Sequence, residues 1–178
     1  MSSIELLSND SDFDGIAENL SSLLWRGDNQ DIKIDFPRNY DKYNKAPTTV
    51  AKNLKMDNKN CLPGVRRQFI AFDKTSFDKE DEMAVGMSTI QIIEDTPDII
   101  DPATPNVSIF ICSPFRGKGI GRYMMKFMLD YAEEFNGQAW TKVRRLNVLS
   151  DSMIRASGFS EIHGSELDRF FIYPATLG

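Results

Sequence analysis

An apolar strand, a glycine-rich loop and an amphipathic helix follow one another between residues 107 and 137, and this succession constrains the fold most. Residues 107–112 form a hydrophobic run of the length of a buried strand. Beyond the loop, hydrophobic side chains recur at helical spacing until Gly137: Ile120, Met124, Phe127, Met128, Tyr131 and Phe135. The sequence therefore predicts a strand, a tight turn and a long helix in direct succession.

The loop between this strand and this helix combines glycines with cations. It reads Arg116-Gly117-Lys118-Gly119-Ile120-Gly121, and Arg122 follows. Glycine has no Cβ to keep a phosphate from the backbone amides, and the start of a helix adds unpaired N–H groups and a partial positive charge. We therefore predict that the loop holds the diphosphate of a nucleotide-tailed cofactor. The loop by itself also fits a plain tight connection with solvated basic residues.

Two common phosphate loops do not match this stretch. A P-loop needs Gly-x-x-x-x-Gly-Lys followed by Ser or Thr, and the sequence contains no such string. A dinucleotide-binding fold places Gly-x-Gly-x-x-Gly near the first strand of a βαβ unit. Here the loop lies two thirds of the way along the chain, and its glycine spacing differs. Both arrangements are therefore excluded.

Two motifs carry a resemblance to one family. The pattern Arg-x-x-Gly-x-Gly, at Arg116, Gly119 and Gly121, resembles the acetyl-CoA signature of the GNAT acetyltransferase superfamily. Residues 146–159 resemble the family's strand, splayed asparagine, short helix and Gly-Phe ending. The motifs stand in the family's order, about 28 residues apart, and the similarity covers residues 82–173. The first 60 or so residues match no recognisable motif.

The resemblance implies a fold. We expect a single GNAT domain over residues 1–178, of mixed α/β (α+β) class. Its central sheet should be mixed and mostly antiparallel, with six to seven strands that splay in the middle and about four flanking helices. Residues 1–60 would form a divergent helical acceptor region, and residues 66–173 would form the cofactor-binding core.

Residue patterns place the remaining elements. We expect strands at 4–7, 68–72, 83–93, 141–148, 159–162 and 170–173, and helices at 11–27, 47–56 and 150–157. Residues 94–106 are acidic and rich in proline, so they should form an exposed loop before the cofactor strand.

Composition limits the functional classes. A content of 41% hydrophobic and 26% charged residues is that of a soluble globular domain, and no apolar run approaches the roughly 20 residues of a membrane span. No secretory signal is visible, so cytoplasm is the expected location. The net charge of −5 argues against a nucleic-acid-binding surface. Cys61 and Cys112 form no disulfide framework and do not indicate a metal site.

The resemblance also implies a reaction and the residues that hold its cofactor. Acetyl-CoA, or another short acyl-CoA, would donate its acyl group to a primary amine of a small molecule or protein, with a homodimer as one possible assembly. The glycine loop would bind the diphosphate, the cofactor strand would pair with the pantetheine arm, and one asparagine amide would reach that arm. These cofactor-binding residues are Phe110, Ile111, Cys112, Arg116, Gly117, Lys118, Gly119, Ile120, Gly121, Arg122 and Asn147.

The groups that move protons are less clearly marked. Relatives usually protonate the departing thiolate from a tyrosine, but Ile154 stands at that position. Ser150, Ser152, Ser157, Tyr173 or water could replace it, and the sequence selects none of them. The acids nearest the cofactor strand are Glu94, Asp95 and Asp101. His163 is expected in a solvated turn. A catalytically weak or inactive acyl-CoA-binding or interaction protein therefore stands as the alternative function.

Overall fold

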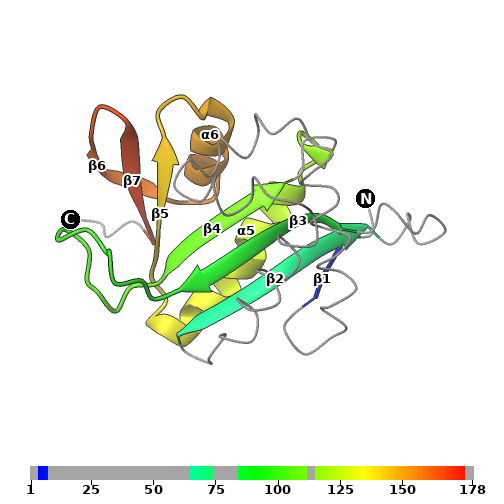
Figure 1. Cartoon of the computed structure of the whole chain (residues 1–178), viewed down its shortest axis with the longest axis horizontal. Coiled ribbons are helices and arrows are strands. Elements are labelled where there is room, and N and C mark those ends of the chain that lie inside the picture. The colour runs from blue at the N-terminus through cyan, green and yellow to red at the C-terminus, as the bar shows by residue number, and fades with distance from the viewer. Residues whose placement is uncertain (1–3, 8–64, 74–83, 112–114, 175–178) are drawn as a thin grey trace, which may run out of the picture.

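A computed structural model describes residues 4–7, 65–73, 84–111 and 115–174 (Figure 1). These residues form one seven-stranded sheet of order β1-β2-β3-β4-β5-β7-β6. Its strands are β1 Ile4–Leu7, β2 Arg66–Asp73, β3 Ala84–Gln91, β4 Asn106–Ile111, β5 Ala139–Arg144, β6 Ser160–Gly164 and β7 Asp168–Tyr173. The described helices are α5 Ile120–Ala132, the short 3-10 helix η3 Glu133–Phe135, and α6 Val148–Ala156. The predicted mixed, mostly antiparallel sheet is confirmed, while the predicted helices 11–27 and 47–56 lie outside the described residues.

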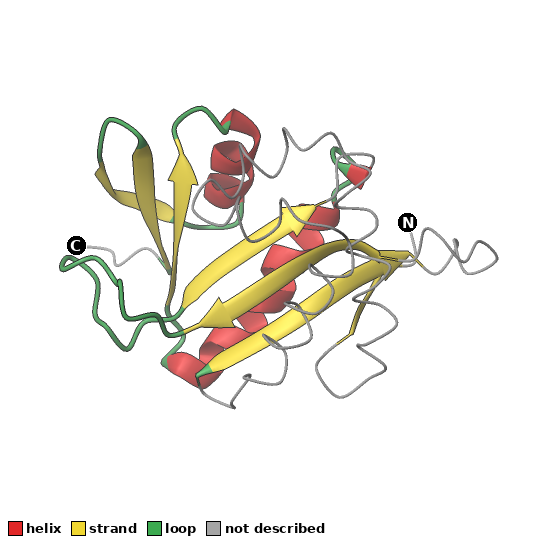
Figure 2. Cartoon of the chain, viewed as in Figure 1, coloured by secondary structure: helices red, strands yellow, loops and turns green. Residues whose placement is uncertain are grey.

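The first half of the sheet consists of β1 to β4, which pair antiparallel in sequence order. Side chains on a strand alternate between the two faces, so Phe69 and Ile90 point to the same side as Val107. Helix α5 covers that side (Figure 2) and buries Met124, Met125 and Met128 against it. The periodicity read from the sequence therefore reflects a real apolar face, although its last turn is the 3-10 helix η3.

The second half of the sheet contains β5, β7 and β6. Strands β5 and β7 pair antiparallel over six residues, and β7 pairs with β6 across a bulge. Strand β5 spans residues 139–144, not the predicted 141–148, because the chain turns after Arg144 and starts α6 at Val148. His163 lies inside β6, and not in the turn expected after it.

The two halves meet at a single pair of strand residues. Strands β4 and β5 run parallel and pair only at Asn106 and Trp140. Around this junction the backbone N–H of Trp140 donates to the Pro105 carbonyl at 2.9 Å, and its indole N–H donates to the Thr104 carbonyl at 3.1 Å. Beyond it β4 and β5 diverge, as Figure 1 shows. The splayed sheet implied by the resemblance is thus confirmed.

One hydrophobic cluster spans the junction and holds the halves together. Its buried members are Phe69, Ile90, Val107, Met125, Met128, Ala132, Phe135, Ala139, Val143, Ile154, Phe159 and Phe171. Within the described ranges, neither α-helix is long and apolar enough to cross a membrane.

Candidate active site

A cleft of about 1160 Å³ opens where β4 and β5 diverge. Its walls are β4 on one side and β5 with the first turns of α6 on the other, and the glycine loop lies at one end. Residues from the turn after β3, including Glu94 and Asp95, also line it. The sheet's splay thus creates a space that reaches the predicted diphosphate loop.

The glycine loop has the backbone geometry that its sequence requires. Gly117 and Gly119 adopt positive φ angles of 75° and 81°, in the left-handed region that favours glycine. Gly119 is the N-cap of α5, and the helix has neither a side-chain cap nor an acidic residue in its first turn. Ile120 is buried and anchors the helix start in the core. The first N–H groups of α5 are therefore available to an anion.

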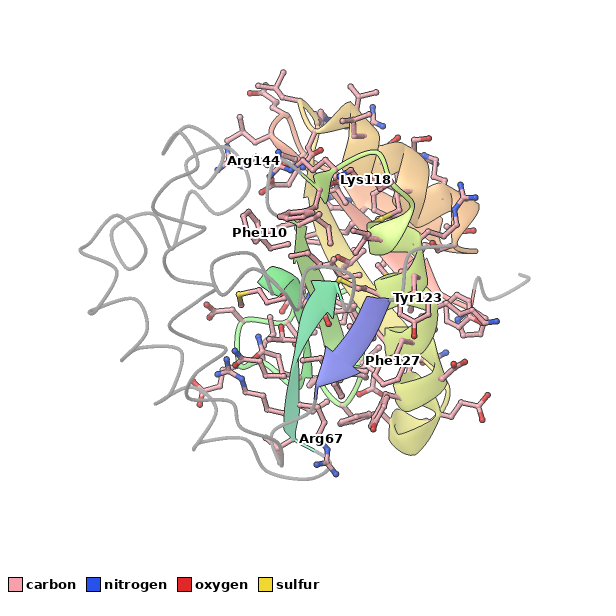
Figure 3. All side chains as sticks on the ribbon, turned by 90° about the vertical axis from the view of Figure 1, so that its right-hand side faces the viewer. Arg67, Phe110, Lys118, Tyr123, Phe127 and Arg144 are labelled. Atoms are coloured by element: carbon pink, nitrogen blue, oxygen red, sulfur yellow. The ribbon has the colours of Figure 1, made fainter. Side chains whose placement is uncertain are left out.

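The three predicted cations lie differently around this loop. The Nε of Arg116 donates to the Ile111 carbonyl at 2.9 Å, and its guanidinium lies 5.8 Å from the centre of the Phe110 ring. Arg116 and Arg122 line the cleft, whereas Lys118 is exposed with its Nζ 5.2 Å from the Phe115 ring centre. Figure 3 shows Lys118 and Phe110 at the same end of the molecule, with Arg67 at the other. The cleft is therefore positively charged at its loop end.

Gly121 allows the two described α-helices to approach each other. A Cβ at this position would stand 2.8 Å from the sulfur of Met153 in α6 and 3.8 Å from Cγ1 of Ile111. Real Cβ atoms essentially never come that close to another heavy atom, so a larger residue would displace Met153. The third glycine of the motif therefore leaves room for the Met153 side chain beside the loop.

Asn147 lies at the start of α6, and not in a strand as its motif had suggested. Its side-chain Oδ1 accepts a hydrogen bond of 3.1 Å from the backbone N–H of Ser150, which makes it the N-cap of the helix. Asn147 and Ser150 both line the cleft. The asparagine thus orients the helix that forms the cleft wall.

The catalytic candidates separate into two groups. Ser150 and Glu94 line the cleft. Ser152 is exposed on α6 and does not belong to the lining, and Tyr173 instead packs on Phe159 with ring centres 5.4 Å apart. Ile154 is 3% exposed and belongs to the hydrophobic cluster. Cys112 lies outside the described residues.

Sequence reasoning missed an ion-pair network that holds α6 on the second half of the sheet. Asp151 Oδ1 accepts from Arg169 at 2.9 Å and its Oδ2 accepts from Arg155 at 3.2 Å, while Arg155 also pairs with Glu161. Burial alone would raise the pKa of Asp151, but the hydrogen bonds and charges of the two arginines outweigh it and lower that pKa below its ordinary value. The Asp151–Arg155 spacing of four residues was the available signal; the partners on β6 and β7 were not visible in the sequence.

A second missed feature is the charged wall that β5 and β7 give to the cleft. Asp168 of β7 lies 3.9 Å from Lys142 and 3.6 Å from Arg144, both on β5. All three residues line the cleft. Asp168 therefore partly neutralises the positive charges of this wall, whereas the loop end of the cleft is lined by Arg116 and Arg122.

Comparison with known proteins supports the fold and identifies the family. A search of curated sequences gives no significant match. Among solved structures, RimL, the ribosomal L7/L12 alpha-N-protein acetyltransferase in complex with coenzyme A, matches with a TM-score of 0.69 at 16% identity over 95% of this chain and 92% of that one. The spermidine N-acetyltransferase of Vibrio cholerae, in complex with CoA and spermine, matches with a TM-score of 0.62 at 15% identity over 95% and 94%. An acetyltransferase of Thermus thermophilus matches with a TM-score of 0.63 at 16% identity over 98% and 99%.

The sequence itself matches one family model. The model describes the Acetyltransferase (GNAT) family and matches residues 40–159, about two thirds of the chain. This match contains the glycine loop, α5, the junction at Trp140 and the Gly-Phe ending of α6. The chain therefore belongs to the acetyltransferase (GNAT) family.

Proposed function

We propose that this chain transfers the acetyl group of acetyl-CoA to a primary amine of a small molecule or protein. The observation that carries the proposal is the open N-terminus of α5 beneath a left-handed glycine loop, at the end of a cleft that the splayed sheet creates. A diphosphate needs unpaired N–H groups and a basic surrounding, and this end of the cleft has both.

The positive charges and the open helix start at the loop end of the cleft support this cofactor. The backbone from Gly117 to Arg122 and the side chains of Arg116 and Arg122 would hold its diphosphate, with Lys118 at the outer margin. Strand β4 pairs with β5 only at Asn106, so we propose that an extended arm lies along β4 at Phe110 and Ile111 like an added strand, beside the Arg116 side chain that already donates to the Ile111 carbonyl. When bound, acetyl-CoA supplies an activated thioester.

Within the cleft, the protein's own groups would guide proton movement. Of the hydroxyl candidates Ser150, Ser152, Ser157 and Tyr173, Ser150 is the one that lines the cleft, so we assign it the role of proton donor to the departing thiolate. Glu94 also lines the cleft, and its carboxylate would take a proton from the amine through water. Asn147 would fix the turn that presents Ser150.

The nature of the acceptor is part of the same proposal. Two of the three structural neighbours described above carry names that refer to acceptors, one to spermidine and one to the ribosomal protein L7/L12. We assign acceptor recognition to residues 1–60, which, apart from β1, lie outside the described residues. We also propose a cytoplasmic location and a homodimer.

A binding and turnover experiment tests the function. We expect acetyl-CoA to raise the melting temperature, since excess ligand at 100 times Kd stabilises by about 2.7 kcal/mol. Thiol release should follow with at least one of spermidine, n-butylamine and trialanine. Arg122→Glu should weaken both effects because Arg122 lines the cleft, whereas Lys126→Glu, one helical turn along the same exposed side of α5, should not.

Three results would separate the alternatives. An unchanged melting curve with millimolar acetyl-CoA would contradict cofactor binding. If Arg122→Glu and Lys126→Glu reduce the thermal stabilisation and the thiol release equally, the cause is a general charge effect and not a diphosphate site. Binding without any thiol release would favour the inactive acyl-CoA-binding protein.

A further inference from the structure

Three polar side chains form a row across the face of the sheet that points away from α5. The row consists of Gln68 on β2, Thr89 on β3 and Ser108 on β4, and we call it the polar row. Gln68 is the cross-strand partner of Thr89, and Thr89 is the partner of Ser108. Such partners point to the same face. On the same face, the neighbouring cross-strand row consists of the hydrophobic residues Ile70, Met87 and Phe110.

Two of the three members of the polar row are buried, and Ser108 is half-buried. Gln68 is fully buried and Thr89 is 4% exposed. Arg66 donates to Oε1 of Gln68 at 3.4 Å, but Nε2 of Gln68 has no hydrogen-bond partner among the described residues. The two inner members of the row are therefore fixed in the protein interior.

Only one end of the polar row reaches the cleft. Ser108 lines the cleft, whereas Thr89 and Gln68 lie behind it. The Oγ atoms of Ser108 and Thr89 are 2.7 Å apart, a short hydrogen bond in which either can donate. Ser108 stands two residues before Phe110 on the same strand, which corresponds to about 7 Å along β4. Its hydroxyl therefore lies on the cleft wall, about two residues from the stretch of β4 that we assign to the cofactor arm.

We propose that the Ser108 hydroxyl, oriented by Thr89, binds the reacting amine of the acceptor. This inference rests on the proposed function. When Ser108 donates its hydrogen to Thr89, both lone pairs of its Oγ are free to accept, and one of them takes an N–H of the neutral amine. The amine's own lone pair is then left to face the acyl carbon. Ser108 is a binding residue in this scheme, and Thr89 is the positioning residue behind it.

The chemistry of the step balances without any further reactant. The amine nitrogen forms a bond to the acyl carbon as the bond from that carbon to sulfur breaks. The nitrogen loses one proton and the sulfur gains one, so an amine and a thioester become an amide and a thiol. A hydroxyl pair does not itself titrate near neutral pH, so the contribution of Ser108 is orientation of the amine and not removal of its proton.

Steady-state kinetics with the best acceptor from the amine panel test this assignment. Ser108→Ala should lower kcat/KM for the amine by about two- to tenfold, as expected for one neutral hydrogen bond, with KM for acetyl-CoA unchanged. Thr89→Val should have a smaller effect of the same kind, and Thr89→Ser, which keeps the hydroxyl, should restore the activity. The double variant Ser108→Ala/Thr89→Val should be no worse than Ser108→Ala, because Thr89 acts through Ser108.

Ser88→Ala is the matched control. Ser88 precedes Thr89 on β3, is 1% exposed, and points to the α5 face with no hydrogen-bond partner for its hydroxyl among the described residues. Removing that hydroxyl should leave the kinetics for both substrates unchanged. Melting temperatures of all variants, measured in parallel, show whether any loss comes from misfolding.

Several outcomes would overturn the assignment. Unchanged kcat/KM for the amine in Ser108→Ala would do so, as would an equal loss in Ser88→Ala or a change confined to KM for acetyl-CoA. Failure of Thr89→Ser to restore activity would remove Thr89 from the scheme. If the wild-type protein binds acetyl-CoA but acetylates no amine of the panel, the transfer reaction itself fails, and the role of Ser108 fails with it.

Discussion

Among the residues that the structure describes, the two halves of the sheet differ in the interactions that join their elements. The half with β1 to β4 and α5 packs around hydrophobic side chains: Met124, Met125 and Met128 of α5 are all at most 1% exposed. The half with β5 to β7 and α6 shares that core but adds five ion pairs within its described residues. The proposed cofactor loop belongs to the first half and the proposed acid to the second. In the proposed function, cofactor binding and proton donation would thus depend on different halves of one sheet.

The largest expected effect lies at the junction between the halves. Trp140→Ala removes a 3%-exposed side chain that contacts both sides, so it should lower the free energy of unfolding by about 3–5 kcal/mol. Because the same residue joins β4 to β5, acetyl-CoA binding should weaken as well. Urea denaturation and isothermal titration calorimetry measure the two effects.

Trp140→Phe serves as the control for this variant. It keeps most of the aromatic volume but loses the indole donor to the Thr104 carbonyl, so its cost should be about 1–3 kcal/mol. A loss as large as that of Trp140→Ala would show that the hydrogen bond, and not the packing, joins the halves.

The next effect concerns the hydrophobic half. Met128→Ala leaves a cavity in a fully buried position and should cost about 2–5 kcal/mol. Because no charge is involved, the cost should be the same at low and high salt. Urea denaturation at both ionic strengths checks this, and a strong salt dependence would contradict the contrast between the halves.

A smaller effect is expected from the helix cap in the second half. Asn147→Ala removes the acceptor for the Ser150 N–H and should cost about 0.5–2 kcal/mol of stability. Asn147→Asp, which keeps an accepting oxygen, should lose much less. If Asn147→Ala instead leaves the melting temperature unchanged and weakens acetyl-CoA binding alone, its amide serves the ligand and not the helix.

The smallest effect, and the one most sensitive to conditions, is expected from Asp151→Asn. The pKa of Asp151 is lower in the folded protein, so its charge stabilises the fold above the ordinary aspartate pKa of 3.8, and this contribution disappears as the pH falls through the folded-state pKa. Wild type and variant should therefore differ at neutral pH and converge in acid. Salt should also reduce the difference. Urea denaturation across this pH range measures it, and a difference that grew toward acid would have the wrong sign.

The sequence was most informative where local pattern and geometry coincide. The glycine loop was predicted from its glycines between an apolar strand and a helical pattern, and the buried face of α5 from hydrophobic residues that repeat at a fixed period. The structure adds that Gly117 and Gly119 adopt a left-handed backbone. The end of β5 was predicted wrongly, since the run from Lys142 to Val148 contains strand-forming residues but no proline or glycine to mark the turn at Arg144.

Features that depend on distant parts of the chain were not predictable in this way. Thr89 and Ser108 are separated by 19 residues, and their contact follows from strand register, which a single sequence does not specify. The same applies to Asp151 and Arg169, which lie 18 residues apart. The role of Trp140 was missed because the predicted strand began one residue after it.

The single residue pair between β4 and β5 has a consequence for how the protein opens. Each long ladder of backbone hydrogen bonds belongs to one half, so breaking the pair at Asn106 and Trp140 separates two intact ladders. Amide hydrogens should therefore exchange with solvent in two cooperative groups, one from β2 to β4 and one from β5 to β7. A ligand lying between the strands would take the place of the missing ladder, and the two groups should then exchange as one.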